Sequence, residues 1–387
     1  MILPADVVGP RYTMRESCRG CGHPEFVSVL DLGHQPLANG FRAKDDASPE
    51  YRFPLHLVRC PVCELVQLTC VVDPQVLYGQ HYPYRSGYSD AWVQHCHALA
   101  KQIGKGKSVL EIGCLDGVLL RHCRDNGCTV LGIDPSAPPL EIPVLRELFT
   151  RETRPGQFDV VVAQNVLGHV DDARGFLQGV QFALQSGGEA IIECPWVVEL
   201  IDGVEWDTVY HEHLSYWGLR PLMRLAREVG LAVTRVQSFP ALHGGLMRYT
   251  LRHMGQREDP SVQALYADEQ MEASDWKRFR VTAEEQALTW NHWFTITDHR
   301  IAAFGASAKL NTFLNSLPDK PPIICLFDDI PAKRGLVSPG WRFPVVEPSR
   351  EALAQIDTLL VGASNWKTAI EARARDLGFR GDVRSLW

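Results

Sequence analysis

Residues 109–117 read VLEIGCLDG, an apolar run that ends in a turn with two glycines. A helical pattern, VLLRHCRDNG (118–127), follows this turn. Three further apolar runs come next: CTVLGIDPS (128–136), FDVVVAQN (158–165) and EAIIECPW (189–196). Repeated alternation of strand, turn and helix predicts an open parallel sheet with helices on both faces.

The carboxyl ends of the first two predicted strands carry acidic residues and glycines. Ligands of doubly wound sheets bind at this edge, where glycine lets the backbone approach them closely. The pattern is not GxGxxG, so we expect no diphosphate nest and disfavour NAD or FAD. An acid that ends the second strand can instead accept hydrogen bonds from both ribose hydroxyls of an adenosyl group. The residues concerned are Glu111, Gly113, Asp116, Gly117 and Asp134.

This combination is typical of methyltransferases that use S-adenosylmethionine (SAM). Asn165 ends the third predicted strand and is expected near the methionine part of the cofactor. The alternative is a glycine turn in a different dinucleotide-binding sheet, or in a sheet that binds no ligand.

Two CxxC pairs lie upstream of the predicted sheet: CRGC holds Cys18 and Cys21, and CPVC holds Cys60 and Cys63. Each pair suits tetrahedral Zn²⁺, because a knuckle presents two thiolates to one metal. Neither pair opens a helix in a βαβ unit, which disfavours a redox role. Four unrelated cysteines are the alternative. Because nothing else nearby points to catalysis, we expect a structural zinc.

The composition is that of a globular protein. The 387 residues are 45% hydrophobic and 22% charged, enough for two or three domains. A net charge of −7 without basic runs disfavours nucleic acid as a partner. The sequence shows no signal peptide and no apolar stretch long enough to span a membrane, so no membrane partner is expected. Eleven cysteines, an odd number, favour a reducing cytoplasm over disulfide bonds.

The patterns divide the chain into an α/β protein of several parts. We expect a zinc-binding domain at residues 1–80, a SAM-dependent methyltransferase domain at 81–254 and a helical connector at 255–296. A smaller α/β domain is expected at 297–387, because RIAAFGASAKLN starts another strand–glycine–helix unit.

The stretch DTVYHEHLSYW (207–217) gathers proton-handling side chains after the fourth predicted strand. Its His211 and His213 are two residues apart, so on a helix they would diverge by about 200°. This is not the His-Glu-x-x-His spacing of zinc proteases, and no third ligand is evident. A loop of hydrogen-bonded polar residues is the alternative. The position at the carboxyl edge of the sheet favours acid–base chemistry, and His169 leaves the same edge.

Taken together, the motifs resemble a known family, the three-domain SAM-dependent sugar C-methyltransferases. These are typified by the 3-C-methyltransferases of nucleotide-linked 4-keto-deoxysugars. The resemblance covers nearly the whole chain and implies a zinc domain, a central Rossmann-like class I methyltransferase domain and a C-terminal Rossmann-like domain that helps to enclose the substrate. The motifs, in order, are CRGC, CPVC, YPYRSGYS, LEIGCLDGVLL, NVLGHVDD, YHEHLSYW, FGASAKLNTFLN and FDDIPAKRGLVSPGWRFPVV.

The resemblance also implies roles for individual residues. His213 would be the base that removes the C3 proton of the sugar, which a neighbouring C4 ketone makes acidic. Tyr210 and Glu212 would be its neighbours, and Glu212 would orient His213 as a carboxylate does in hydrolytic triads. His169 would face the reacting centre. The methyl group would then pass to C3 of the enolate, with no need for a catalytic metal.

Contacts to the substrate are expected from three further motifs. YPYRSGYS would supply Tyr84, in preference to Tyr82, as a catalytic contact to the sugar, and Ser86 as a further one. Lys309 in GASAKLN, at the start of a predicted helix, suits a diphosphate or sugar. His243 in HGGLMR is a candidate for the sugar. For the last two motifs, a turn that serves packing alone is the alternative.

The sequence departs from the family pattern at two places. Leu115 stands where the family usually has a polar residue, which leaves Asp116 as the side chain for the methionine end of SAM. The order of Asn365 and Trp366 in GASNW is the reverse of the usual one.

The leading hypothesis is therefore C3 methylation of a nucleotide-diphosphate 4-keto-6-deoxysugar by a cytoplasmic monomer. One alternative is an O- or N-methyltransferase that acts on a sugar or small metabolite. Others are a non-catalytic binding module that uses the zinc knuckles, and a zinc hydrolase, which would hold two zinc ions per chain.

Overall fold

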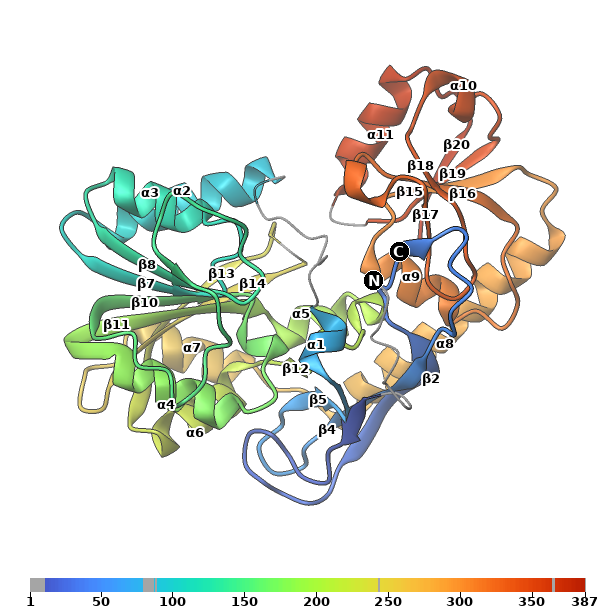
Figure 1. The fold of residues 1–387 in the computed structure, drawn as a ribbon. Helices are drawn as coiled ribbons and strands as arrows, with labels where there is room; N and C mark the ends of the chain where they lie inside the picture. The colour runs from blue at the N-terminus through green and yellow to red at the C-terminus, as the bar shows by residue number, and fades with distance from the viewer. Residues whose placement is uncertain (1–10, 79–86, 88, 243, 364–365, 387) are drawn as a thin grey trace.

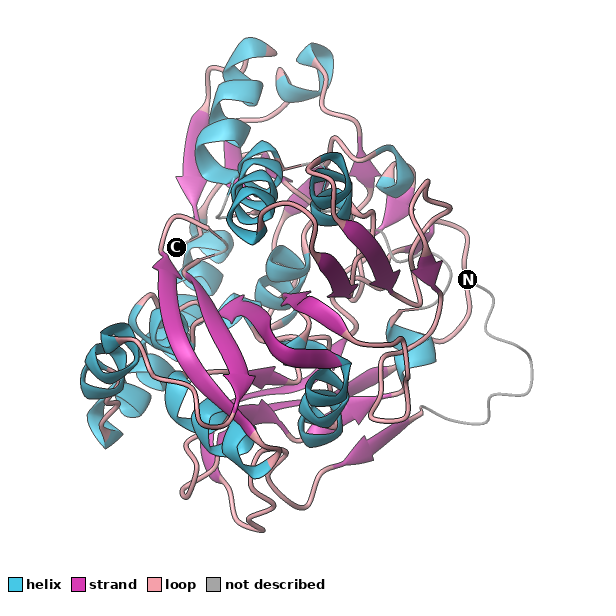
Figure 2. Ribbon diagram, turned by 90° about the vertical axis from the view of Figure 1, so that its left-hand side faces the viewer, coloured by secondary structure: helices cyan, strands magenta, loops and turns pink. Residues whose placement is uncertain are grey.

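The computed structural model describes residues 11–78, 87, 89–242, 244–363 and 366–386. The chain forms three units (Figure 1): the central part of the sequence lies at the left, the C-terminal part at the upper right and the N-terminal part below. Figure 2 shows helices and strands through the whole molecule, as expected for an α/β chain. The described part of the chain has no helix that is both long and apolar enough to cross a membrane.

The central unit contains a seven-stranded sheet in the order β13-β14-β11-β10-β7-β8-β9. β14 runs in the direction opposite to that of the other six strands. The chain order reverses between β7 and β10, which makes their carboxyl ends the point where a ligand is expected. The strands are β7 (Ser108–Ile112), β8 (Thr129–Ile133), β9 (Val144–Leu145), β10 (Phe158–Gln164), β11 (Leu184–Pro195), β13 (Leu231–Phe239) and β14 (Leu246–His253).

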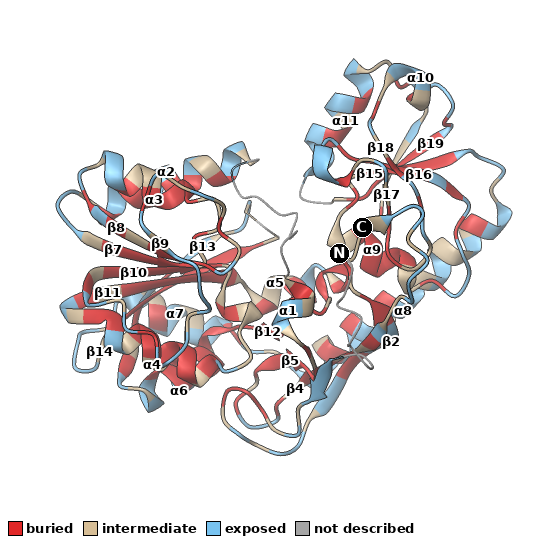
Figure 3. Cartoon of the chain, in the orientation of Figure 1, coloured by how far each residue is buried: buried red, intermediate tan, exposed pale blue. Residues whose placement is uncertain are grey.

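Helices cover both faces of this sheet. α2 (Asp90–Ile103) and α3 (Val118–Asp125) pack on one face, and α4 (Ala173–Ala183), α6 (Leu219–Glu228) and α7 (Pro260–Asp268) lie on the other (Figure 1). α4 and α6 each have a buried side and an exposed side, as the colours of Figure 3 show, and most of their buried residues are apolar. This is the amphipathic pattern that the sequence predicts for helices on a sheet.

The N-terminal unit has two small antiparallel sheets. β1 (Tyr12–Met14) pairs with β6 (Cys70–Val72). The larger sheet has the order β12-β5-β4-β2, and its own strands are β2 (Val27–Pro36), β4 (Arg52–Arg59) and β5 (Val66–Leu68). Its fourth strand, β12 (Ser215–Tyr216), comes from the central part of the sequence. After β6, the short helix α1 (Pro74–Leu77) leads toward the central unit.

The C-terminal unit is a second, smaller parallel sheet with the order β18-β16-β15-β19-β20. Its strands are β15 (Ile301–Phe304), β16 (Ile323–Phe327), β18 (Val345–Val346), β19 (Thr358–Val361) and β20 (Asp382–Ser385). The helices of this unit are α9 (Ala308–Asn315), α10 (Arg350–Leu353) and α11 (Lys367–Asp376). The architecture therefore confirms the predicted fold class.

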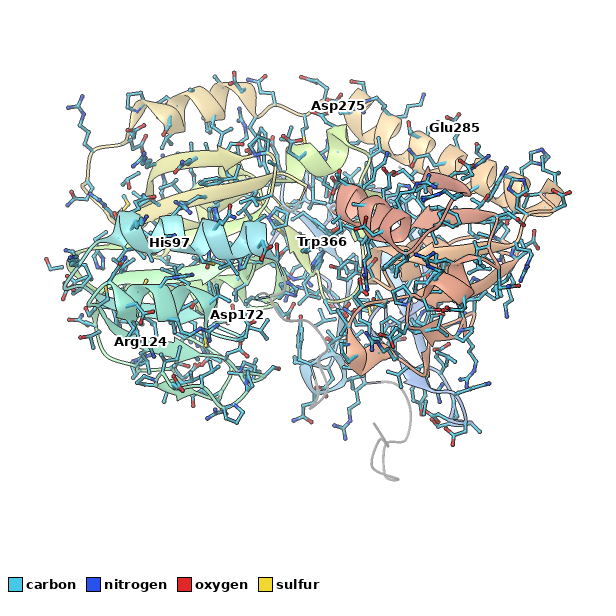
Figure 4. All side chains as sticks on the ribbon, turned by 90° about the horizontal axis from the view of Figure 1, so that it is seen from above. His97, Arg124, Asp172, Asp275, Glu285 and Trp366 are labelled. Carbon is cyan, nitrogen blue, oxygen red and sulfur yellow. The ribbon has the colours of Figure 1, made fainter. Side chains whose placement is uncertain are left out.

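A long helix and two strand pairings join the units. The 24-residue helix α8 (Ala273–Ile296) leads into the C-terminal unit, and its Asp275 and Glu285 lie along one edge of the molecule (Figure 4). β17 (Leu336–Val337) of the C-terminal unit pairs with β3 (Arg42–Ala43) of the N-terminal unit. With β12, the N-terminal unit thus pairs strands with both other units.

Candidate active site

The site is built on a tight turn at Tyr210–His213. After β11, the chain passes through α5 (Val197–Asp202) and the 3₁₀ turn η3 (Trp206–Thr208) before it reaches this turn. A hydrogen bond of 2.9 Å from the N–H of His213 to the carbonyl of Tyr210 closes the turn. The end residues Tyr210 and His213 are half-buried, and their rings stack with centroids 4.0 Å apart. The inner residues His211 and Glu212 are 0% and 1% exposed.

A backbone carbonyl fixes the tautomer of His213. Its Nδ1 lies 2.9 Å from the carbonyl oxygen of Thr208, which only accepts hydrogen bonds, so Nδ1 carries the proton. The hydroxyl of Tyr216 donates to the same carbonyl at 3.0 Å. Burial, and then the neighbouring His169, lower the pKa of His213 well below its ordinary value. The ring is therefore neutral near pH 7, with the lone pair of Nε2 able to take a proton.

His169 reaches the same place from the sheet. It ends the 3₁₀ turn η2 (Leu167–His169) directly after β10, and its ring centroid lies 5.0 Å from that of His213. The hydroxyl of Tyr78 lies 2.9 Å from its Nδ1. Burial lowers the pKa of His169 to about 4, so this ring is neutral as well. Sequence reasoning missed Tyr78, although it opens the aromatic-rich stretch that continues into YPYRSGYS.

Glu212 does not hydrogen-bond to the ring of His213 as a triad carboxylate would, because the Thr208 carbonyl holds Nδ1. The Oε1 atom of Glu212 instead accepts a hydrogen bond from Nδ2 of Asn39 at 3.0 Å. Burial raises the pKa of its carboxyl group. His211 also turns away from His213, and its Nε2 lies 3.3 Å from the carbonyl of Phe53. The two histidines thus serve different neighbours, so they do not form a pair of metal ligands.

Several predicted contacts cannot be placed. Tyr82, Tyr84, Ser86 and His243 lie outside the described residues. The structure does place Lys309. Its Nζ lies 3.1 Å from Oε2 of Glu205, the residue that precedes η3. The predicted lysine of the C-terminal unit therefore lies beside the segment that leads to His213.

The cofactor edge has the backbone geometry that the glycines predict. Gly113 has φ +74°, and a Cβ atom there would lie 2.3 Å from Cγ2 of Val166. Gly117 precedes α3 with φ +69°. Leu115 and Asn165 also have positive φ, 44° and 55°, which is costly for residues other than glycine. Such strain gathers at ligand sites, and here it marks the ends of β7 and β10.

Acidic side chains surround this edge. Asp134 accepts hydrogen bonds from the N–H groups of Leu115, at 2.9 Å, and Ser136, at 2.7 Å. Asp116 accepts from the N–H of Gly87 at 2.8 Å. Burial, and then Asp116 and Asp134, raise the pKa of Glu111 well above its ordinary value. The edge therefore has an excess of acidic groups.

These residues fit SAM. Within the described part of the chain, Oε2 of Glu111 and Oδ1 of Asn165 are buried acceptors without a hydrogen-bond partner. The positively charged sulfonium and ammonium groups of SAM would complement this acidic edge. The glycine turn lets the backbone approach a ligand closely.

A buried ionic network lies beneath the edge and was not predicted. Glu193 on β11 is 2.5 Å from Nε of Arg248, 3.0 Å from Nε2 of His95 and 2.6 Å from Nε2 of Gln164. The carbonyl of Glu193 also accepts the N–H of Asn165 at 2.8 Å. The network therefore supports the strained residue at the end of β10. Its residues are scattered along the sequence and form no motif, so the network was not predictable from the sequence.

The four predicted cysteines come together. The sulfur atoms of Cys18, Cys21, Cys60 and Cys63 all lie within 4.8 Å of one another, and no other metal-binding group of three or more residues occurs among those the structure describes. Four thiols in this arrangement fit tetrahedral Zn²⁺. Nε2 of Gln67 donates to the sulfur of Cys18 at 3.2 Å, a contact that orients this ligand.

The fold and these two sites define a SAM-dependent methyltransferase with a structural zinc site. Three family models match consecutive parts of the chain: a zinc binding domain (residues 18–78), a methyltransferase domain (84–236) and a C-methyltransferase C-terminal domain (241–382).

A curated relative, C-methyltransferase NovU of Streptomyces niveus, is 30% identical over 387 aligned positions, which cover 92% of this chain and 91% of NovU. The chain belongs to this family of three-domain, SAM-dependent C-methyltransferases, and it is an enzyme.

Other similarities are partial. A ubiquinone biosynthesis O-methyltransferase of Pseudomonas paraeruginosa is 30% identical over 115 residues, 26% of this chain and 47% of that protein. Among solved structures, the 1,6-didemethyltoxoflavin-N1-methyltransferase of Burkholderia thailandensis is 16% identical with a TM-score of 0.37, and covers 50% of this chain and 98% of its own. Magnesium protoporphyrin IX methyltransferase of Synechocystis is 13% identical with a TM-score of 0.35, and covers 47% and 97%.

Proposed function

We propose that the enzyme methylates C3 of a nucleotide-diphosphate 4-keto-6-deoxysugar. The observation that carries this proposal is the hydrogen bond of 2.9 Å between Nδ1 of His213 and the carbonyl of Thr208. This bond leaves Nε2 as a neutral base, and a carbon acceptor needs a base because it carries no lone pair of its own. NovU, the relative that matches over nearly its whole length, is a C-methyltransferase.

In this proposal, Nε2 of His213 accepts the C3 proton, and the electrons of the C–H bond move into the adjacent C4 ketone to form an enolate. Bound SAM supplies an electrophilic methyl group. The hydroxyl of Tyr210 and the ring of His169, which lie against His213, are the proposed donors to the enolate oxygen. The half-buried setting of these rings limits the access of water to the base.

The geometry of the edge supports an assignment of the cofactor contacts. We assign the ribose hydroxyls to Asp134 and the methionine end to Asp116 and Asn165. Gly113 and Gly117 give the backbone close approach. Glu111 lies deeper, at 5% exposure, and offers the edge a buried carboxyl oxygen that has no hydrogen-bond partner among the described residues.

The diphosphate needs a cation, and we assign this role to Lys309. Its Nζ is 3.1 Å from Glu205 and its side chain is only 15% exposed, which places the charge beside the catalytic segment. Tyr82, Tyr84 and Ser86 are assigned to the sugar from the family resemblance, and His243 from its place in HGGLMR. We further propose a monomer that works in the cytoplasm.

The test is mass spectrometry after incubation with SAM and a panel of 4-keto-6-deoxy nucleotide sugars in D₂O. We expect one sugar to gain a methyl group. Without SAM, the same sugar should exchange its C3 hydrogen for deuterium, because the base acts before methyl transfer. Methylation without exchange would favour an O-methyltransferase. If SAM binds but no sugar in the panel is methylated, the proposed substrate class is wrong.

A further inference from the structure

The turn that carries His213 is held by the zinc-binding domain. β12, directly after the turn, pairs with β5 through Ser215 opposite Gln67 and Tyr216 opposite Val66. Leu68 adds a hydrogen bond of 2.9 Å from its N–H to the carbonyl of Leu214. The segment after the base is therefore a strand of the N-terminal sheet, although the residues before it follow the central sheet.

The two inner residues of the turn point into the same domain. His211 contacts the carbonyl of Phe53 on β4 at 3.3 Å, and Glu212 accepts the amide of Asn39 at 3.0 Å. Tyr210 and His213 flank these two residues, and the hydrogen bond that closes the turn and the contact between their rings join them. The contacts of the zinc-binding domain with His211 and Glu212 therefore also constrain the positions of Tyr210 and His213.

Asn39 lies in a loop that is itself fixed from two directions. The N–H of Gly40 donates to the carbonyl of Leu37 at 2.9 Å, which closes the loop. From the C-terminal domain, Nδ2 of Asn311 on α9 donates to the carbonyl of Ala38 at 2.7 Å. Ala38 and Asn311 are 3% and 1% exposed. The loop thus links α9 to the turn.

The loop that carries His169 is held by the zinc-binding domain as well. Arg15 and Arg19, on either side of Cys18, contact Oδ1 of Asp171 at 2.9 and 3.2 Å. Asp171 follows His169 by two residues. Both imidazoles of the site therefore depend on contacts from this domain.

From these contacts we propose that Asn39 is a positioning residue for the base: through Glu212, it sets the orientation of His213. The zinc-binding domain is thereby part of the catalytic apparatus. This inference rests on the proposed role of His213 as the base. The physical reason is the burial of the Glu212 carboxyl group. It stays in place while a hydrogen-bond donor faces it, and it moves when that donor is lost.

A swap of the two partners tests the proposal. Asn39→Ala removes the donor, and Asn39→Asp sets two carboxyl groups against each other; both should lower kcat by about 10–100-fold, with little change in the Kd of SAM. In the double variant Asn39→Asp/Glu212→Gln, the new amide donates to the new carboxylate. Its kcat should return to that of Glu212→Gln alone. Asn291→Ala is the matched control, because it removes an exposed amide–carboxylate contact of 3.1 Å to Asp319 and should leave kcat unchanged.

A second readout needs no substrate. In protein with ¹⁵N-labelled histidine, the ring signals of His213, assigned by their loss in His213→Asn, report its tautomer. We expect the Nδ1–H form in the wild type, altered signals in Asn39→Ala and recovery in the swapped pair. Unchanged signals and unchanged kcat in Asn39→Ala would overturn the proposal, as would a swapped pair no better than Asn39→Asp. If no sugar is methylated by the wild type, the proposed substrate fails, while these signals still decide the role of Asn39.

Discussion

Nδ1 of His213 lies 2.9 Å from the carbonyl oxygen of Thr208, five residues earlier in the chain. This bond fixes the tautomer and orientation of the ring, as a carboxylate does in hydrolytic triads, but the carbonyl places no full charge beside the ring. A neutral partner does not stabilise the imidazolium strongly, so burial dominates and the pKa of His213 falls. The result is a base that remains unprotonated at neutral pH.

His213→Ala should lower kcat by roughly 10²–10⁴-fold, because the C3 proton loses its acceptor. The Kd of SAM should stay near the wild-type value, since His213 is not among the residues at the ends of β7, β8 and β10. Steady-state kinetics and calorimetry measure the two quantities. His292→Ala, at an exposed position on α8, is the control and should retain wild-type turnover. Wild-type kcat in His213→Ala would remove this residue from the mechanism.

Gly113→Ala should weaken SAM binding. Its Cβ would lie 2.3 Å from Cγ2 of Val166, so Val166 and the adjacent Asn165 must move. Gly127→Ala is the matched control: its φ of +84° resembles the +74° of Gly113, but nothing lies within 4 Å of an added Cβ. Both variants should lose about 1–2 kcal/mol of unfolding free energy from backbone strain.

Calorimetric titration with SAM separates the two glycine variants. We expect the Kd to rise at least about tenfold for Gly113→Ala, one tenfold step being about 1.4 kcal/mol, and to stay unchanged for Gly127→Ala. Equal Kd values would show that the turn at Gly113 does not shape the cofactor edge.

The elements formed by local pattern were predictable from the sequence. The strands at Glu111, Asp134 and Asn165 follow from apolar runs that end in turns, and the parallel order of the sheet follows from the helices between them. The four cysteines were predictable because CxxC spacing has few structural uses. In each case, residues close in sequence carry the whole signal.

The contacts that set the site were not predictable in this way. Asn39 and Glu212 are separated by 173 positions, and nothing local indicates that they meet. The partner of His213 is a backbone carbonyl, which every residue has, so sequence reasoning chose the adjacent carboxylate of Glu212 instead. The pairing of β12 with β5 was missed because a two-residue strand has no periodicity to read.

The stability of the protein should depend on pH through His211. Burial lowers its pKa in the fold to about 4, from 6.5. Between these values the unfolded chain binds more protons, so the contribution of His211 to stability is present above pH 6.5 and is lost as the pH falls toward 4. The slope is at most about 1.4 kcal/mol per pH unit.

His211→Gln keeps a donor for the carbonyl of Phe53 but does not titrate. The difference in unfolding free energy between wild type and variant, from urea titrations, should therefore change between pH 6.5 and 4. The wild-type curve alone is not sufficient, because burial raises the pKa of Asp207 to about 6 and this acts in the opposite direction. A constant difference across the window would contradict a neutral, buried His211.

Cys60→Ser should abolish zinc binding and lower both stability and activity. Cys60 is 0% exposed and lies 3.5 Å from the sulfur of Cys21, so losing its thiolate removes a quarter of the metal site. Structural zinc contributes directly to folding, and we expect a larger loss of soluble, folded protein than of turnover per folded molecule. Cys325→Ser, in the C-terminal sheet and outside the cysteine cluster, is the control for loss of a buried thiol. Metal analysis, thermal unfolding and kcat per folded chain decide the outcome: a zinc-free variant with wild-type stability and turnover would show that the cysteine cluster serves neither the fold nor the turn of His213.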